Sequence, residues 1–215
     1  MARIPLVLDL AGVSCLVVGA GAVAERKVRI LHRAGARIRL VAPRATWRLR
    51  DLVRRGKLGW RCGRFREGDL RGARLVLAAT SDLAVNRAVA RAAARRRVFV
   101  NVADDPDSGS VQMPAIYRRG ALLVAISTSG RSAGAARALR DDLARRLGPE
   151  YAAYVAILGG ARARVLRSVS DRRERRRRLQ ALRRAPILPL LRRGAVAAAR
   201  SVAWKAAGFV PTGGR

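Results

Sequence analysis

Short apolar runs alternate with longer stretches of amphipathic helical pattern along the first hundred residues. The apolar runs fall at 13–18, 37–41, 58–62, 74–79 and 98–102, and the main helical stretches at 23–33, 46–55 and 82–95. Continuous apolar runs are typical of strands buried on both faces, and an intervening helix joins parallel strands. The pattern therefore predicts an α/β fold with a Rossmann-type parallel sheet.

The pattern changes after residue 105. Two extended runs, 110–117 and 121–127, are joined by Arg118-Arg119-Gly120, which is typical of a β-hairpin. The hairpin has little sheet to join in so small a domain, and an exposed edge favours pairing with a second copy. We therefore expect a twofold homodimer. The apolar face assigned to this hairpin consists of Val111, Met113, Leu123 and Ala125.

Helical patterns dominate the rest of the chain. They cover 132–147, about 150–169 and 171–184, and Gly148-Pro149 ends the first of them. Pro186, Pro189 and the glycine-containing end at 211–215 indicate a loosely held tail, although 196–209 has the pattern of a short helix. The predicted division is a domain with a Rossmann-type sheet over 1–110, a dimerisation hairpin and helix over 111–149, and a basic helical region with its tail over 150–215.

The segment between the first apolar run and the first helical stretch fits a dinucleotide-binding turn. It reads Gly19-Ala20-Gly21-Ala22-Val23-Ala24, a G-x-G-x-x-A pattern. Glycine at 19 permits the sharp reversal from strand to helix, and glycine at 21 lets backbone N–H groups approach a pyrophosphate. The helix that follows directs its positive dipole end at the same phosphates. An ordinary glycine-rich turn is the alternative.

Ligands of such sheets gather at the carboxyl ends of the strands. We therefore expect the cofactor to lie against the glycine turn and the residues that follow the second, fourth and fifth strands. These candidate cofactor-binding residues are Gly19, Gly21, Ala22, Val23, Ala24, Pro43, Thr80 and Asn101. Asp104 follows the fifth strand and is expected at the same edge of the sheet.

The chain is strongly basic, with 46 basic and 14 acidic side chains and a formal net charge of +32. Such an excess favours polyanionic partners, either nucleic acid or an acidic small molecule. Aromatic residues form 4% of the chain, which leaves few stacking surfaces for bases, so nucleic acid is the less favoured partner. A bias in genome base composition is an alternative source of part of the arginine excess.

Cysteine and histidine are too scarce for most metal sites. The chain contains Cys15, Cys62 and a single histidine, His32, and no CxxC pair. A disulfide scaffold, a multi-histidine zinc site and a histidine-based triad are not indicated, and no resident metal is expected. No apolar run reaches the ~18 residues of a membrane span and the opening segment is too short for a signal peptide, so we expect a cytoplasmic protein.

Several segments together resemble the precorrin-2 dehydrogenase family, which includes the N-terminal half of siroheme synthase. The most specific segment is the glycine turn with the Glu25-Arg26-Lys27 that follows it. The others occur in the family's order and spacing: Val41-Ala42-Pro43, Ala78-Ala79-Thr80 with Val85-Asn86, Asn101-Val102 with Asp104 and Pro106, Met113-Pro114-Ala115, and Leu123-Val124-Ala125-Ile126-Ser127-Thr128-Ser129-Gly130. The resemblance covers about residues 4–147.

The resemblance implies an NAD-dependent oxidation of precorrin-2 to sirohydrochlorin, and in many members the insertion of ferrous iron to give siroheme. The family's essential aspartate corresponds to Asp104, which would take up the proton that accompanies hydride loss. Asp105 is the neighbouring alternative, and a turn-forming or capping role before Pro106 is the structural alternative for Asp104. Any iron would be held transiently by the macrocycle and a carboxylate.

The implied substrate is a polycarboxylate tetrapyrrole, which gives the basic charge a specific partner. By the resemblance, the substrate is bound by the loop after the hairpin, through Ser127, Thr128, Ser129, Gly130 and Arg131. The resemblance also suggests a homodimer.

Two alternatives stay open. The second strand ends in Ala42-Pro43-Arg44, without the acidic residue that holds a ribose 2′-hydroxyl, so NAD is implied by the family alone and Arg44 leaves NADP as an alternative. The second alternative concerns function: a nucleotide-binding regulatory module whose arginine-rich helices bind nucleic acid. The interval 161–184, with eleven arginines and two acidic residues, is the region that this alternative would use.

Overall fold

Five parallel strands form one sheet in the order β3-β2-β1-β4-β5. The computed structural model describes residues 4–210. The strands are β1 (Ser14–Val18), β2 (Arg37–Ala42), β3 (Gly59–Cys62), β4 (Leu75–Ala78) and β5 (Phe99–Val102). The connections contain α1 (Ala22–Arg33), α2 (Trp47–Arg54), the 3-10 helix η1 (Glu67–Leu70) and α3 (Leu83–Arg95). This strand order is that of a doubly wound sheet, so the predicted Rossmann-type α/β fold is confirmed.

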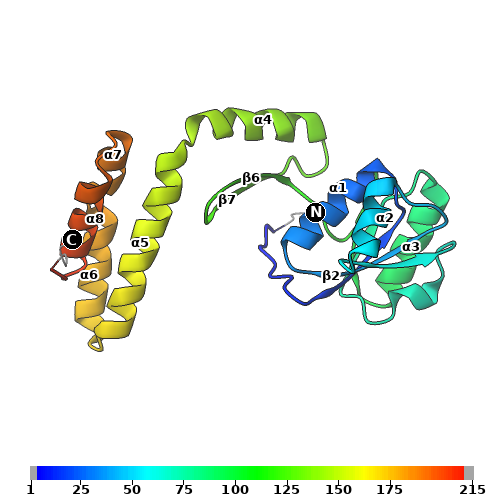
Figure 1. The fold of residues 1–215 in the computed structure, drawn as a ribbon, viewed down its shortest axis with the longest axis horizontal. Coiled ribbons are helices and arrows are strands. Elements are labelled where there is room, and N and C mark those ends of the chain that lie inside the picture. The colour runs from blue at the N-terminus through cyan, green and yellow to red at the C-terminus, as the bar shows by residue number, and fades with distance from the viewer. Residues whose placement is uncertain (1–3, 211–215) are drawn as a thin grey trace. The chain divides into compact units, whose positions relative to one another are not determined.

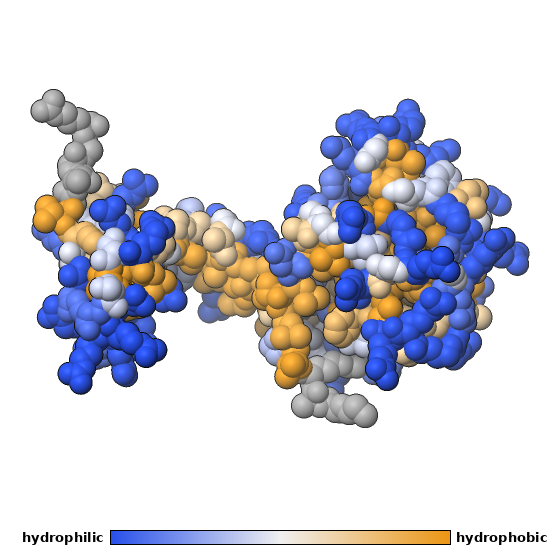
Figure 2. All heavy atoms as spheres, turned by 90° about the horizontal axis from the view of Figure 1, so that it is seen from below, coloured by the Kyte–Doolittle hydropathy of each residue, from blue (hydrophilic) through white to orange (hydrophobic). Residues whose placement is uncertain are grey.

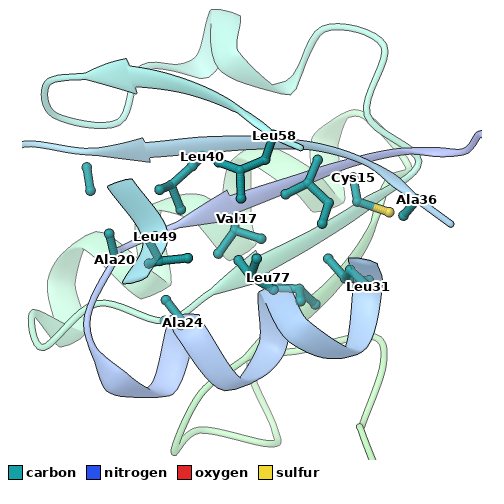
Figure 3. Close-up of a cluster of buried hydrophobic side chains, with 14 of the residues drawn as sticks. Cys15, Val17, Ala20, Ala24, Leu31, Ala36, Leu40, Leu49, Leu58 and Leu77 are labelled. Carbon is teal, nitrogen blue, oxygen red and sulfur yellow. The ribbon is translucent and has the colours of Figure 1, made fainter. Parts of the chain in front are cut away.

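Alternate residues of the strands β1, β2 and β4 enter two separate cores, one on each face of the sheet. Cys15 and Val17 of β1 lie in the core with α1 and α2, whereas Leu16 and Val18 lie in the core with α3. Figure 3 shows the first core, with Ala24 on the side of α1 that faces the sheet. Burial on both faces explains why β1 and β4 are continuous apolar runs rather than alternating ones.

The second half of the chain contains a β-hairpin followed by helices. The hairpin pairs β6 (Ala115–Arg119) with β7 (Leu122–Ile126) in antiparallel register. The helices are α4 (Ala133–Arg146), α5 (Pro149–Ser168), α6 (Arg172–Arg184), α7 (Ile187–Arg192) and α8 (Val196–Ala206). The helices α5 to α8 enclose a core of their own, and Figure 1 shows them side by side.

The predicted loose tail is wrong for Ile187–Arg192, which form α7, whereas the short helix expected at 196–209 is confirmed by α8 (Val196–Ala206). Ile187 of α7 and Ala199 of α8 are fully buried in the core between these helices. Pro186 and Pro189 are compatible with α7 because they lie at its N-cap and in its first turn, where backbone N–H groups have no acceptor within the helix. The predicted flexible end at 211–215 lies outside the described residues.

The hairpin is shorter than the sequence pattern predicts. Val111 donates its backbone N–H to β5 at 2.9 Å, and Met113 packs against the core that contains α1. The prediction that Val111 and Met113 form an apolar hairpin face with Leu123 and Ala125 is therefore wrong. Pro114, which has no N–H to donate, lies just before the first hairpin strand.

Side chains cap four of the helices and define where they begin. In each of these helices, the N-cap side chain accepts a hydrogen bond from a backbone N–H of the first turn. The N-cap residues are Thr46 for α2, Asp82 for α3, Ser132 for α4 and Asp171 for α6. Such a cap stabilises a helix by about 1 kcal/mol. Helix α1 differs, because its N-cap is Gly21 and no side chain caps it.

The chain divides into two compact units. The sheet unit comprises 1–113 and 129–131, and the helical unit comprises 114–128 and 132–215. The short turn at 129–131 therefore belongs to the sheet unit, although its neighbours in sequence belong to the helical unit. The finer division of the chain at residues 110 and 149 stays a prediction.

Charged side chains cover much of the surface, and Figure 2 shows the hydrophilic residues in blue. Arginines surround the few acidic groups: Glu174 of α6 bonds to Arg177 at 2.8 Å and to Arg178 at 2.7 Å. These hydrogen bonds lower the pKa of Glu174 to about 2. Between residues 4 and 210, no helix combines the length and the apolar character needed to cross a membrane.

Candidate functional site

The turn between β1 and α1 requires glycine at its first position. Gly19 has a φ of +100°, in the region that favours glycine. A Cβ on Gly19 would lie 2.6 Å from the carbonyl carbon of Ala79 and 2.9 Å from the Thr80 nitrogen, far inside van der Waals contact. The Gly19 N–H donates to the Val41 carbonyl at 2.9 Å. The turn is therefore clamped between the ends of β2 and β4, at the carboxyl edge of the sheet.

The N-terminus of α1 is open to an anionic ligand. A Cβ on the N-cap residue Gly21 would meet no atom within 4 Å. The first i→i−4 hydrogen bond of the helix runs from the Glu25 N–H to the Gly21 carbonyl at 2.9 Å, so the N–H groups of Ala22, Val23 and Ala24 have no acceptor within the helix. Free N–H groups and the helix dipole bind phosphate, and this cradle fits the pyrophosphate of a dinucleotide. Ala24 is itself fully buried, as close packing of helix on strand requires.

Two further predicted cofactor residues flank this turn. Pro43 is exposed just beyond β2, and its carbonyl accepts a hydrogen bond from the Cys62 thiol at 3.2 Å. Thr80 follows β4 and donates from its N–H and its Oγ1 to Asn86 Oδ1 at 3.1 and 2.8 Å. Asn86 Nδ2 donates back to the Thr80 carbonyl at 3.1 Å. Asn86, 1% exposed, therefore shapes this strand end, a role that the sequence analysis did not assign to it.

The end of β5 carries a buried polar pair, Asn101 and Lys27 of α1, which are 6% and 8% exposed. Lys27 Nζ donates to Asn101 Oδ1, and Asn101 Nδ2 donates to the Val111 carbonyl at 2.9 Å. Burial lowers the pKa of Lys27 to about 8; the charge of Arg26 lowers it further, and the Asp104 carboxylate opposes the shift. The sequence analysis missed Lys27, although a charged residue on the apolar face of α1 was a signal for it.

Asp104 and Asp105 differ in what their carboxylates do. Asp104 is exposed and has a left-handed backbone, with a φ of +61°. For a non-glycine residue this conformation costs about 1–3 kcal/mol, and such strain clusters at functional sites. Asp105 accepts hydrogen bonds from the Ser108 hydroxyl at 2.6 Å and the Ser108 N–H at 3.2 Å, which lower the pKa of Asp105. Within residues 4–210, no hydrogen bond or ion pair ends on the Asp104 carboxylate, so it is available to a ligand.

The turn at 129–131 lies against the segment that follows Asp104. Gly130 has a φ of +87°, and a Cβ on it would lie 2.8 Å from Cγ of Pro106 and 3.0 Å from Nε2 of Gln112. Ser129 has a positive φ of +55°. Three of the predicted substrate residues, those at 129–131, are therefore brought close to the segment that carries the predicted catalytic aspartate.

The two remaining predicted substrate residues, Ser127 and Thr128, belong to the helical unit. Thr128 Oγ1 donates to the Ser132 carbonyl at 2.9 Å and accepts from the Ser132 N–H at 3.0 Å. This hydroxyl fixes the entry into α4. Residues 4–210 contain no cluster of three or more His, Cys, Asp or Glu side chains that could hold a metal ion.

The clamped glycine turn, the open N-terminus of α1 and the strand order define a dinucleotide-binding protein of the Rossmann type. A sequence model of the family described as "Putative NAD(P)-binding" matches residues 6–115. Siroheme synthase 3 of Aeromonas hydrophila is 40% identical over 177 residues, which are 82% of this chain and 38% of that protein. The siroheme synthase of Nitrosospira multiformis is 38% identical over 202 residues, 92% of this chain and 43% of that protein. The chain thus spans about two fifths of the length of these relatives.

A solved structure of SirC, a precorrin-2 dehydrogenase, has the same fold with a TM-score of 0.75 and 26% sequence identity. The match covers 96% of this chain and 100% of that one, so the likeness extends into the C-terminal helices. The chain therefore belongs to the family described as "Putative NAD(P)-binding".

Proposed function

We propose that the protein oxidises precorrin-2 to sirohydrochlorin, with a nicotinamide dinucleotide as the electron acceptor. One observation carries the proposal: the exposed carboxylate of Asp104, free of hydrogen bonds within residues 4–210, follows β5 at the same edge of the sheet as the phosphate-binding turn. The fold likeness to SirC and the siroheme synthase relatives support the choice of substrate.

The residues divide into a cofactor-binding group and a proton acceptor. The proposed cofactor contacts are Gly19, Gly21, Ala22, Val23, Ala24, Pro43, Thr80 and Asn101. The bound nicotinamide supplies an acceptor for the hydride that leaves the macrocycle. Asp104 takes the proton lost in the same oxidation, so that two electrons and two hydrogens leave the substrate in total. Because Asp104 is exposed, its carboxyl group then releases the proton to water.

The substrate's carboxylates require cationic and hydrogen-bonding partners. The proposed contacts are the N–H groups and side chains of Ser129, Gly130 and Arg131, together with Ser127 and Thr128 just before them in sequence. The exposed Arg131 offers two parallel N–H donors to a carboxylate, which lysine cannot do.

The proposed acceptor is NAD. Family membership supports it, whereas the sequence at the end of β2 places Arg44 where many NAD enzymes have an acidic residue. Steady-state kinetics with NAD and NADP test this point. A lower KM for NADP that is lost in Arg44→Glu would contradict the choice of NAD.

Three further parts belong to the proposal. Ferrous iron is a second substrate, with Asp104 accepting the pyrrole protons that iron displaces. The protein is a homodimer, because β6 and β7 pair only with one another among residues 4–210 and such short sheets favour pairing with another copy. The setting is the cytoplasm, where the two free cysteines, Cys15 and Cys62, stay reduced.

The test is an anaerobic assay with precorrin-2 and NAD, following NADH absorbance and the sirohydrochlorin spectrum. Asp104→Asn keeps the shape of the side chain and removes the base, so kcat is expected to fall by about 100-fold or more while NADH affinity is retained. Asp105→Asn is the matched control and is expected to keep most of the activity. Adding ferrous iron then tests chelation.

Two results would contradict the proposal. The first is oxidation by Asp104→Asn at the wild-type rate. The second is a wild-type protein that binds NADH and oxidises no precorrin-2. Salt-sensitive DNA binding by such an inactive protein would favour the regulatory alternative instead.

A further inference from the structure

Lys27 is a buried cation without an anionic partner at hydrogen-bond distance. It is 8% exposed, on a helix face whose other buried residues, such as Ala24 and Val28, are apolar. Within residues 4–210, the hydrogen-bond contacts of Nζ are Asn101 Oδ1 and, at 3.9 Å, Met113 Sδ. Burying an ammonium group costs free energy that an apolar side chain would not cost. Packing alone therefore does not explain a lysine at this position.

A chain of hydrogen bonds runs from Lys27 through the end of β5. Lys27 Nζ donates to Asn101 Oδ1, Asn101 Nδ2 donates to the Val111 carbonyl at 2.9 Å, and the Val111 N–H donates to the Val100 carbonyl at 2.9 Å. An ammonium group can only donate, so it determines which end of the Asn101 amide faces α1. A flipped amide would direct its NH2 group at the ammonium. The chain of bonds thus ties α1, β5 and the segment at Val111 into one frame.

Asp104 lies three residues beyond this frame. Its left-handed backbone, with a φ of +61°, is unfavourable on its own and persists only when the surrounding structure holds it. Lys27 and Asp104 also act on each other electrostatically, since the Asp104 carboxylate opposes the burial that lowers the pKa of Lys27 to about 8. The other charge that acts on Lys27 is that of Arg26, from the same helix.

We propose that Lys27 is a positioning residue for the oxidation: its ammonium group holds the Asn101 side chain and, through it, the turn that presents Asp104. The kinetic part of this inference rests on the proposed function. The interaction between Lys27 and Asn101 does not depend on the proposed function, and it can be measured without an activity assay. Lys27 loses its charge as the pH rises through about 8, so the hold on the amide weakens over that range.

The kinetic test compares Lys27→Met, which keeps the length and removes the charge, with Lys27→Arg. Lys27→Met is expected to lower kcat by tenfold or more with a much smaller change in the KM for NAD, and Lys27→Arg to recover part of the loss. The kcat of the wild type is expected to decline near pH 8, and that of Lys27→Met to lack this step. Arg33→Met, an exposed position in the last turn of α1, is the matched control. Wild-type kcat and an unchanged pH profile in Lys27→Met would overturn the proposal.

The second test needs no activity. The side-chain amide signals of Asn101 are followed by 1H–15N NMR in cofactor-free protein from pH 7 to 10, and are assigned by their loss in Asn101→Ala. They are expected to shift with a midpoint near pH 8 in the wild type and to stay constant in Lys27→Met. Signals that do not move in the wild type overturn the inference whatever the activity. A titrating amide in a protein that does not oxidise precorrin-2 would instead contradict the proposed function and leave the Lys27–Asn101 interaction standing.

Discussion

The two units of the chain bury different kinds of side chain. Among residues 4–210, the buried polar or charged residues are Lys27, Asn86 and Asn101, and all three belong to the sheet unit. They hold the strand ends that carry Thr80 and Asp104. The core of the helical unit is apolar, and the arginines of α6 are mostly at its surface. Buried polar groups persist only when they are hydrogen-bonded. The interior of the sheet unit therefore shapes a site, whereas the core of the helical unit contributes packing.

The largest expected effect is that of Gly19→Ala. The new Cβ would overlap the Ala79 carbonyl and force a positive φ on alanine, so we expect a loss of about 4 kcal/mol or more in the free energy of unfolding. Gly21→Ala is the control: its Cβ enters open space, so stability should change by about 1 kcal/mol or less, while NADH affinity falls at least tenfold. Urea unfolding and NADH fluorescence measure the two quantities. A wild-type unfolding midpoint for Gly19→Ala would refute the clamp.

The next effect tests whether the core of the helical unit is independent of cofactor binding. Ile187 is fully buried between α5, α7 and α8, so Ile187→Ala is expected to lower the stability of this unit by about 2–4 kcal/mol. NADH affinity should be unchanged, because every proposed cofactor contact is in the sheet unit. Val196→Ala, at an exposed position on α8, is the control. A parallel loss of NADH affinity in Ile187→Ala would break the distinction between the units.

A smaller effect concerns pH and the sheet unit. The pKa of Lys27 is about 8 in the folded protein and 10.5 in the unfolded chain, so the unfolded chain binds more protons between these values. Stability should therefore rise with pH across this window, by on the order of 2 kcal/mol. Urea midpoints from pH 7 to 10 measure the rise, which Lys27→Met should abolish. A rise of the same size in Lys27→Met would assign it to other groups.

The smallest effect is expected at the surface of the helical unit. The pKa of Glu174 is lowered to about 2 by Arg177 and Arg178, so its stabilising contribution is present above its ordinary pKa of 4.5 and is lost as the pH falls through about 2. Glu174 lies at the surface, with 28% of its side chain exposed, and ion pairs at the surface contribute little. Glu174→Gln should lower the melting temperature at pH 7 by about 1–2 °C, and 1 M salt should remove the difference. A decrease that persists in salt would indicate a packing role instead.

The elements of the sheet unit could be predicted from sequence because their signals are local. Apolar runs mark the strands, and Asp82 marks the start of α3 within its own turn. The bond between Lys27 and Asn101 joins residues 74 apart, and no local pattern encodes such a pairing. Helix α7 was missed because its prolines suggest a loop, whereas their positions at the helix start make them harmless.

The sequence predicted the candidate site residue by residue, and the roles of these residues stay predictions. Sequence pointed to Asp104 and to the adjacent Asp105 without a physical reason to separate them. The structure supplies that reason. The Asp105 carboxylate accepts a hydrogen bond from the Ser108 hydroxyl, whereas Asp104 has a left-handed backbone that its neighbours in sequence do not reveal. The sequence also placed residues 127–131 on one substrate-binding loop. In the structure, 127–128 belong to the helical unit and 129–131 belong to the sheet unit.

The turn at 129–131 limits how the two units can be separated by recombination. Because this turn lies with the sheet unit while the residues on both sides of it lie with the helical unit, the chain passes between the units three times. A single recombination breakpoint or truncation within the chain would leave one unit without part of its own structure. The two units are therefore expected to evolve together. Replacement of one unit alone by the corresponding unit of a homologue is not expected.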